Sequence, residues 1–362
     1  MNYSKTMITV ISLPVGGLGG FIAESIGLPM PWMLGSLIIT GCFFSLGKSH
    51  LPINYKFSNK FRLIFIAIIG IMIGSQVNQE LIKQSSNMVI SLLAITVFVV
   101  IAHFTNYIIF RKLGKYDGPT AFFCGAPGGL MESITMGEEV GCDIKLLTVQ
   151  QFLRIISVVI IVPTLMSIWV GEPLGSASGI KLPTSNSELP FFLNYLLVFV
   201  VAVTGLFFGI KLKLPAAHLM GPLIVAALIS LLDVTPIHLP VLLVIISQVV
   251  IGVSLGTRFL DISSSVLYKG AWLSLISVFS MLSIGGLLCC LVAPFTDASL
   301  DVLLISFAPG GVTEMSLIAL SLSANPAAVT LHHLYRIIIT VSGLTFIRRR
   351  FDFIDGKISR KT

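Results

Sequence analysis

Long apolar segments almost free of charge recur along the chain, and they decide what it can fold into. A membrane-spanning helix needs about 20 predominantly apolar residues, and about twelve segments near that length can be placed here. They lie at 7–25, 30–47, 61–77, 87–110, 119–137, 145–170, 191–211, 217–232, 240–256, 267–292, 300–320 and 327–347. Only 11% of the residues are charged, whereas a soluble domain averages about 25%. The sequence therefore predicts an all-α, polytopic transmembrane helical bundle in contact with the lipid bilayer.

The apolar segments form two sets that repeat each other. CGAPGGLMES at 124–133 matches FAPGGVTEMS at 307–316, and QFLRII at 151–156 matches HLYRII at 333–338. Three matched pairs share one and the same spacing along the chain: Pro127 with Pro309, Glu132 with Glu314, and Arg154 with Arg336. Pro, Glu and Arg in one common frame indicate duplication rather than a chance similarity of apolar helices.

The repeat divides the chain into four predicted parts. They are a first transmembrane repeat at 1–170, an extracytoplasmic linker at 171–190, a second transmembrane repeat at 191–347 and a basic cytoplasmic tail at 348–362. The linker is rich in Gly, Pro and Ser, which is typical of a connection rather than of a helix.

Loop charge predicts the topology. Lys and Arg gather in short loops and in the tail, and such residues favour the cytoplasmic side of a membrane. The basic loops fall on one side if each repeat has about five spans plus one re-entrant or broken segment. A full span there would move the loop at 258–269 outside. We therefore expect two repeats of inverted topology in the cytoplasmic (inner) membrane, with both termini cytoplasmic.

Each repeat contains one sequence that cannot continue a helix, Ala-Pro-Gly-Gly at 126–129 and at 308–311. Proline lacks the N–H that a helix needs, and a broken backbone in a membrane is tolerated only where protein or water covers it. The residues after each break can begin a half-helix whose amide end attracts anions. We expect the breaks to meet near the midplane as a substrate site, which includes Pro127, Gly128, Gly129, Pro309, Gly310 and Gly311. The alternative is a pair of purely structural kinks.

Ionisable residues accompany both breaks. Glu132 and Glu314 follow the glycines, and Arg154 and Arg336 lie inside the last helix of each repeat. Ionisable groups at such depth face a partner or an aqueous path. Either each arginine neutralises a glutamate permanently, or the pairing alternates with substrate, H⁺ or Na⁺. Both alternatives remain open.

Two further polar residues are candidates for the same cavity. Gln150 lies one turn before Arg154, and His332 lies one turn before Arg336. The neighbouring His332 and His333 do not make a metal site, because adjacent residues on a helix do not face each other. We expect no metal, no cofactor other than a coupling H⁺ or Na⁺, no enzymatic activity and no nucleic-acid binding.

These motifs resemble the AbrB-duplication family of membrane proteins, some of which are labelled transcriptional regulators or ammonia monooxygenases. The similarity covers almost the whole chain, and the repeated Ala-Pro-Gly-Gly followed by Glu is its most specific part. The resemblance implies a link to the cation–proton antiporter and anion transporter superfamily, with broken helices at the centre. It points to Gly128, Gly129, Gly310 and Gly311 as binding loops. The chain lacks the paired aspartates of proton-exchanging antiporters.

Three functions are compatible with this sequence. The first is secondary transport of a small anionic or zwitterionic metabolite by alternating access at the breaks, coupled to H⁺ or Na⁺. The second is a membrane-embedded sensor that affects gene expression indirectly. A membrane monooxygenase ranks below both, since such an enzyme needs clustered His and carboxylate ligands. A homodimer is kept as a candidate oligomeric state.

Overall fold

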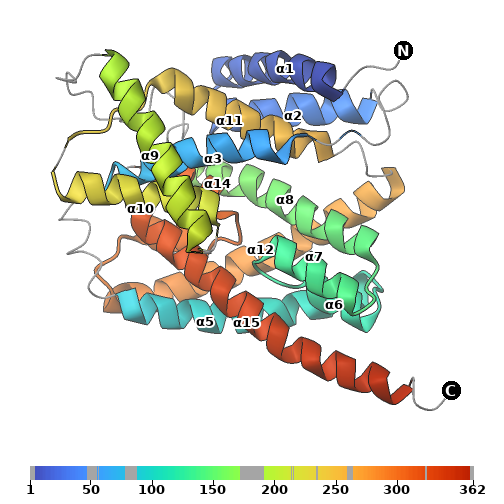
Figure 1. The fold of residues 1–362 in the computed structure, drawn as a ribbon. Helices are drawn as coiled ribbons and strands as arrows, with labels where there is room; N and C mark the ends of the chain where they lie inside the picture. The colour runs from blue at the N-terminus through green and yellow to red at the C-terminus, as the bar shows by residue number, and fades with distance from the viewer. Residues whose placement is uncertain are drawn as a thin grey trace. The chain divides into compact units, whose positions relative to one another are not determined.

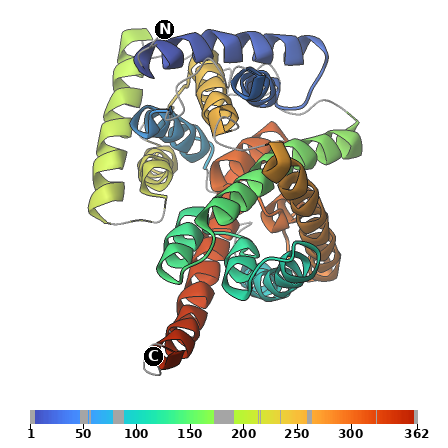
Figure 2. The same cartoon turned by 90° about the vertical axis from the view of Figure 1, so that its right-hand side faces the viewer.

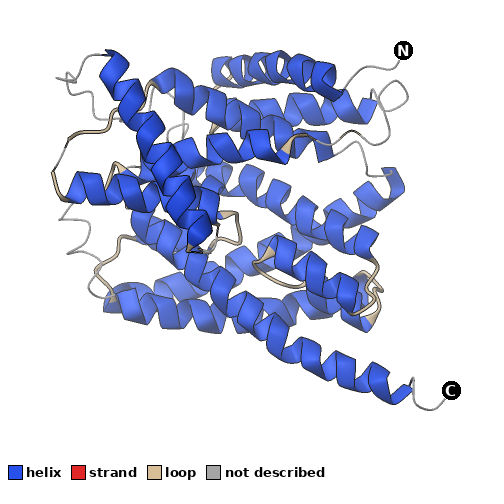
Figure 3. Ribbon diagram, viewed as in Figure 1, coloured by secondary structure: helices blue, strands red, loops and turns tan. Residues whose placement is uncertain are grey.

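The computed structural model describes residues 5–46, 55, 57–77, 88–171, 191–212, 214, 216–233, 235–258, 264–322 and 324–358. These residues form helices joined by short loops, and no strand occurs among them (Figure 3). Six of their helices are long and apolar enough to cross a membrane, and shorter apolar helices accompany them. The predicted all-α, polytopic fold is confirmed. The linker at 172–190 lies outside the described residues.

The helices follow the predicted apolar segments closely (Figure 1). The first half of the chain contains α1 (Lys5–Ser25), α2 (Pro31–Leu46), α3 (Asn59–Gly74), α5 (Met88–Ile108), η2 (Ile109–Leu113), α6 (Gly118–Cys124), α7 (Leu130–Glu139) and α8 (Ile144–Val170). The second half contains α9 (Phe191–Lys211), α10 (Ala217–Leu231), α11 (Val241–Gly256), α12 (Ser264–Val292), η4 (Ala293–Phe295), α13 (Leu300–Phe307), α14 (Val312–Ser321) and α15 (Pro326–Ile358). Each Ala-Pro-Gly-Gly sequence separates two short helices, α6 from α7 and α13 from α14.

The chain forms two compact units, and each unit combines parts of both sequence halves. The first unit comprises 1–84, 160–261 and 316–327, and the second comprises 85–159, 262–315 and 328–362. The compact units therefore differ from the sequence halves, because equivalent helices of the two halves assemble together. The repeat boundaries themselves remain a prediction from the sequence.

In the first unit, helices from one half of the sequence pack against helices from the other half. Helix α1 packs on α2 and α9 packs on α10, whereas α11 packs on α2 and α3 packs on α10 (Figure 2). The third helix of each half thus lies against the second helix of the other half. Equivalent elements make equivalent contacts, as a duplicated sequence predicts.

Glycines allow these helices to approach closely at equivalent positions. A Cβ on Gly35 of α2 would collide with the Gly19 carbonyl of α1, and a Cβ on Gly221 of α10 would collide with the Gly205 carbonyl of α9. Gly35 and Gly221 are as far apart in the sequence as Gly19 and Gly205, so the repeat relates the two crossings to each other. Small residues serve this purpose in membranes, where packing rather than exclusion of water holds helices together.

A second pair of crossings joins the two halves. Gly70 of α3 faces the Leu219 carbonyl of α10, and Gly252 of α11 faces the Met33 carbonyl of α2. The two glycines are equivalent in the repeat, and so are the two residues whose carbonyls they face. A side chain on either glycine would meet backbone, which cannot move aside as a flexible side chain can. The sequence thus places glycine where the two halves of the first unit interlock.

The second unit is built around the broken helices. Helix α5 packs on α12 and on α6, while α12 packs on α13. Phe98 of α5 and Phe307 of α13 make an edge-to-face ring contact at 5.9 Å. Asn106 of α5 accepts a hydrogen bond from Ser277 of α12 at 2.9 Å. These contacts fix α6 and α13, which end at the two breaks.

Candidate functional site

The two breaks leave the helical path through different backbone geometries. Helix α6 ends at Cys124, and Gly129 precedes α7 in the left-handed region with φ 65° and ψ 58°. Helix α13 ends at Phe307, after which Ala308 is extended with φ −62° and ψ 136°. The half-helices then begin at Leu130 and Val312, where the sequence predicts them. Glycine suits position 129 because other residues rarely adopt a positive φ.

A buried arginine caps the carbonyl end of each break. Arg154 of α8 donates a hydrogen bond from Nη1 to the carbonyl of Ala126. Arg336 of α15 donates from Nη1 to the carbonyl of Ala308 and from Nη2 to that of Gly310, the latter at 2.6 Å. In both halves the arginine follows its alanine by 28 residues. The last carbonyls of a helix lack hydrogen-bond partners and carry partial negative charge. A guanidinium group supplies both the missing donors and a compensating positive charge.

A second polar side chain supports each break one helical turn earlier. Gln151 donates from Nε2 to the Phe123 carbonyl at 2.8 Å, and His333 places Nε2 3.0 Å from the Ile305 carbonyl. The separation is again 28 residues in both halves. In each half, the arginine binds the break itself and the residue three positions before it binds the helix that precedes the break. The repeat is thus preserved at the level of single hydrogen bonds.

The glutamates lie at the amide end of each break. Each is the third residue of its half-helix, where a carboxylate complements the helix dipole and can turn back toward the residue before the helix. A Cβ on Gly311 would collide with Oε2 of Glu314, and the Cβ position of Gly129 lies 3.4 Å from Oε2 of Glu132. Both carboxylates therefore fold back over the glycines.

The described residues contain no ion pair between these glutamates and the arginines, whose hydrogen bonds go to backbone carbonyls. Among the described residues, each arginine is thus held by backbone carbonyls. Each break instead has a cation at its carbonyl end and a carboxylate at its amide end, an arrangement that the sequence did not reveal.

Both breaks belong to the second unit. Arg336 and Arg154 are 1% and 6% exposed. Several buried polar atoms around the breaks have no hydrogen-bond partner within the described part of the chain. They are Nε of Arg154 and of Arg336, Oε1 of Gln151, Nδ1 of His333, and Oγ of Ser133 and of Ser306. Burying such atoms without a hydrogen-bond partner costs free energy. A polar ligand or water in this region would supply the missing partners.

The two other predicted site residues make contacts elsewhere in the second unit. Gln150 donates to the Gly270 carbonyl at 3.2 Å and accepts from the Tyr116 hydroxyl at 3.4 Å. His332 contacts the Ser91 hydroxyl through Nε2 and the Ala328 carbonyl through Nδ1, both at 2.7 Å. The adjacent residues, Gln151 and His333, make the contacts to the breaks that we expected of Gln150 and His332. The spacing could not distinguish them, because positions three and four residues before an arginine both lie on its face of a helix.

An apolar cavity of about 430 Å³ lies beside the first break. Its lining comes from α5, α6 and α15 and includes His103, Phe122 and Thr340. The Cβ position of Gly128 is 3.4 Å from the Thr340 hydroxyl, which is an ordinary van der Waals contact. A small side chain at Gly128 would thus touch α15 without a collision.

No group of three or more His, Cys, Asp or Glu side chains suited to a metal ion occurs among the residues that the structure describes. Backbone carbonyls, hydroxyls and carboxylates are the donors present near the breaks, and hard cations prefer such oxygen donors.

Fold and site together define an all-α, polytopic membrane protein built around two broken helices. The chain belongs to the AbrB family: the family described as "Transition state regulatory protein AbrB" matches residues 50–352. Two curated relatives align over nearly their full length. "Uncharacterized protein YhjN" of Bacillus subtilis (strain 168) is 23% identical over 367 aligned residues, covering 95% of this chain and 93% of the relative. "Putative regulator AbrB" of Escherichia coli (strain K12) is 24% identical over 331, covering 89% of each.

Proposed function

We propose that this chain is a secondary transporter that moves a small anionic or zwitterionic metabolite by alternating access at the two breaks, coupled to H⁺ or Na⁺. The observation that carries the proposal is the pair of equivalent helix breaks in one compact unit, each capped by a buried arginine. Broken helices at equivalent positions of two repeats are the usual location of the substrate site in secondary transporters.

The charge around the breaks supports an anionic group on the substrate. Arg154 and Arg336 are buried, and each has an Nε atom without a hydrogen-bond partner among the described residues. The amide ends of α7 and α14 add partial positive charge. A carboxylate on the substrate could bind the two guanidinium groups. An amino group on the same substrate could face Glu132 or Glu314.

The glutamates are the proposed coupling groups. Glu132 is exposed and Glu314 is half-buried, and both carboxylates fold back over a glycine of the break. A carboxylate in this place can take up H⁺, or it can join backbone carbonyls in holding Na⁺. Either event removes negative charge from the break and changes its affinity for an anion. Substrate and coupling ion would thus act on the same charges.

A thermal-shift screen of the purified full-length protein tests the proposed site. The panel contains carboxylates, amino acids, nucleobases, Na⁺ and K⁺ at two pH values. A ligand that binds only the folded state raises the unfolding temperature. We expect a carboxylate or amino acid to stabilise wild type but not Glu132→Gln/Glu314→Gln.

The control for this screen is Glu138→Gln, because Glu138 is exposed at the far end of α7 and its substitution replaces one carboxylate by an amide outside the breaks. Stabilisation by the ligand should be retained in the control. Equal stabilisation of the control and the double variant would place the ligand elsewhere, and a panel without any ligand would favour the second candidate function.

That second candidate is a membrane sensor that affects gene expression indirectly. It is favoured by the family description and by the name of the Escherichia coli relative, both of which refer to regulation. A deletion strain separates the two functions. Changed expression with unchanged solute uptake supports the sensor, whereas loss of uptake that Arg336→Ala fails to restore supports the transporter.

A further inference from the structure

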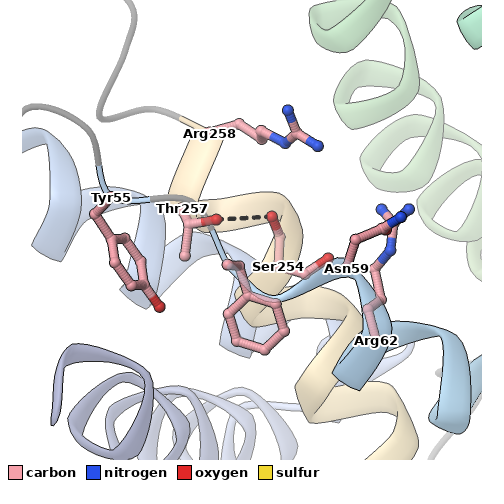
Figure 4. Close-up of a pocket in the computed structure, with 7 residues that line it drawn as sticks. Tyr55, Asn59, Arg62, Ser254, Thr257 and Arg258 are labelled. Atoms are coloured by element: carbon pink, nitrogen blue, oxygen red, sulfur yellow. Dashed lines mark hydrogen bonds between the residues drawn. The ribbon is translucent and has the colours of Figure 1, made fainter. Parts of the chain in front are cut away.

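A small polar pocket lies in the first unit, which contains none of the break residues. It has a volume of about 30 Å³ and is lined by Tyr55, Phe57, Asn59, Arg62, Ser254, Thr257 and Arg258 (Figure 4). Ser254 and Thr257 are each 4% exposed and form its floor, while Asn59 and Arg258 are exposed at its rim. The pocket therefore joins a buried end to an accessible opening.

Two separate elements bring cationic and neutral donors to this pocket. Asn59 and Arg62 come from the first turn of α3, and Arg258 extends from the residues that follow α11 (Figure 4). None of the described residues that line the pocket is acidic. Guanidinium groups offer paired N–H donors whose geometry matches phosphate or carboxylate oxygens. This donor set favours an oxyanion over a cation or an apolar ligand.

The floor of the pocket holds a hydroxyl without a partner. Ser254 Oγ is buried and makes no hydrogen bond within the described residues. The hydrogen bond that joins Ser254 to Thr257 uses the Ser254 backbone carbonyl, which accepts from Thr257 Oγ1 at 2.9 Å. A buried hydroxyl normally has a partner. An anion held by the arginines would supply one.

The sequence repeat shows that this donor set is not required for packing. The equivalent positions of the first half carry Gln76 in place of Arg258 and Met72 in place of Ser254. Yet Gly74 and Gly256, which the repeat relates in the same way, both cross close to a neighbouring helix. The helix crossing therefore forms without the arginine and the serine. Preference of basic residues for the cytoplasmic side could explain Arg258 alone, but it does not explain an unsatisfied serine beneath it.

We propose that this pocket binds a single phosphate group, held by Arg62, Arg258 and the Ser254 hydroxyl. One water molecule needs about 10–15 Å³ of accessible cavity volume. The pocket volume of about 30 Å³ therefore admits two or three oxygen atoms of an anion rather than a whole metabolite. The group comes either from inorganic phosphate or from the headgroup of an anionic phospholipid. This site is separate from the proposed transport site, and neither depends on the other.

The test uses the full-length protein in phosphatidylcholine nanodiscs, with one arm for each source. In the first arm inorganic phosphate replaces chloride at constant ionic strength, and the apparent affinity is read from the thermal shift. In the second arm phosphatidylglycerol is added to the nanodiscs, and native mass spectrometry counts retained lipid. The variants are Arg62→Gln and Arg258→Gln, the latter copying Gln76 of the other repeat. Lys60→Gln is the matched control, since Lys60 lies on the same turn of α3 outside the pocket.

We expect each arginine variant to weaken phosphate binding, or to reduce retention of phosphatidylglycerol, by roughly tenfold or more, because each loses a charge-assisted contact. Lys60→Gln should behave as wild type. Loss confined to the first arm assigns inorganic phosphate, and loss in the second arm assigns a lipid headgroup. If neither arm distinguishes the arginine variants from Lys60→Gln, the proposal is wrong. Unfolding temperatures without phosphate show whether each variant is folded.

Discussion

The arginines at the two breaks differ in the number of carbonyl groups that they bind. Arg336 donates to Ala308 and Gly310, whereas the hydrogen bond of Arg154 goes to Ala126. A lysine in either place retains the charge but lacks the planar fork that reaches two oxygens at once. The two breaks therefore share the same arrangement of arginine and carbonyl groups but differ in the number of hydrogen bonds. The two arginines can thus be compared within one molecule.

Arg336→Lys should destabilise the protein more than Arg154→Lys. The first substitution leaves one buried carbonyl without its charged donor, a loss of about 1.5–3 kcal/mol, whereas the second retains a cation for its single carbonyl. Denaturation in detergent, followed by circular dichroism, measures both free energies of unfolding. Equal destabilisation of the two variants would contradict the hydrogen bonds described here.

The glycines of the first break should also differ in their tolerance of a side chain. Gly129 has a positive φ, and its Cβ position lies 2.9 Å from Val341 Cγ2, whereas the nearest atom to the Cβ position of Gly128 is 3.4 Å away. We expect Gly129→Ala to lower the free energy of unfolding by about 1–2 kcal/mol, since it forces alanine into the left-handed region. Gly128→Ala should be close to wild type in stability. A reversed order in chemical denaturation would show that the backbone at the break differs from this structure.

At the scale of helices, the fold depends on crossings where backbone meets backbone. The same crossing occurs between α1 and α2 and between α9 and α10, at glycines related by the repeat. Other glycines in the same helices have open space around them, and Gly17 has no atom within 4 Å of its Cβ position. The sequence alone shows a cluster of glycines at 16–20 without showing which of them is required.

Gly205→Ala should destabilise the first unit, whereas Gly17→Ala should not. The added methyl group at position 205 meets the backbone of Pro222 and Gly221, and overpacking of this kind costs about 1–3 kcal/mol or more. At position 17 alanine favours the helix and meets nothing. The fraction of monodisperse protein after heating, measured by size-exclusion chromatography, compares the two. Equal loss in both variants would contradict the close crossing.

Helix positions could be predicted well from the sequence, but helix partners could not. The apolar segments mark α5, α8 and α12 because length and lack of charge suffice to identify a span. That α3 packs on α10 depends on contacts between segments far apart in the chain, for which a single sequence gives no direct signal. At the site, the repeat identified Arg154 and Arg336, but helical spacing could not choose between Gln150 and Gln151.

For the whole molecule, the two halves are predicted to have opposite orientations in the membrane. The contacts of equivalent helices agree with duplication, and the orientation itself rests on loop charge. The beginning of α12 around Lys269 decides between the alternatives, since full spans at the breaks would place it outside. The loop around Asp297 is predicted to lie outside.

Labelling of single cysteines tests this topology in intact cells. In a background without the five native cysteines, Asp297→Cys should react with a membrane-impermeant maleimide, and Lys269→Cys should react only after the cells are opened. Lys269 and Tyr268 are exposed in the structure, so the position is accessible to reagent. Labelling of Lys269→Cys from outside would show that the segments with the breaks cross the membrane fully.

Uptake by proteoliposomes, using the ligand found by the thermal-shift screen, tests the central claim most directly. Wild type should accumulate the solute when a gradient of H⁺ or Na⁺ is imposed, and Arg336→Ala and Glu132→Gln should abolish accumulation while remaining folded. Lys112→Ala, an exposed basic residue outside the breaks, should transport as wild type. Uptake by all three variants at the wild-type rate would show that transport does not occur at the breaks.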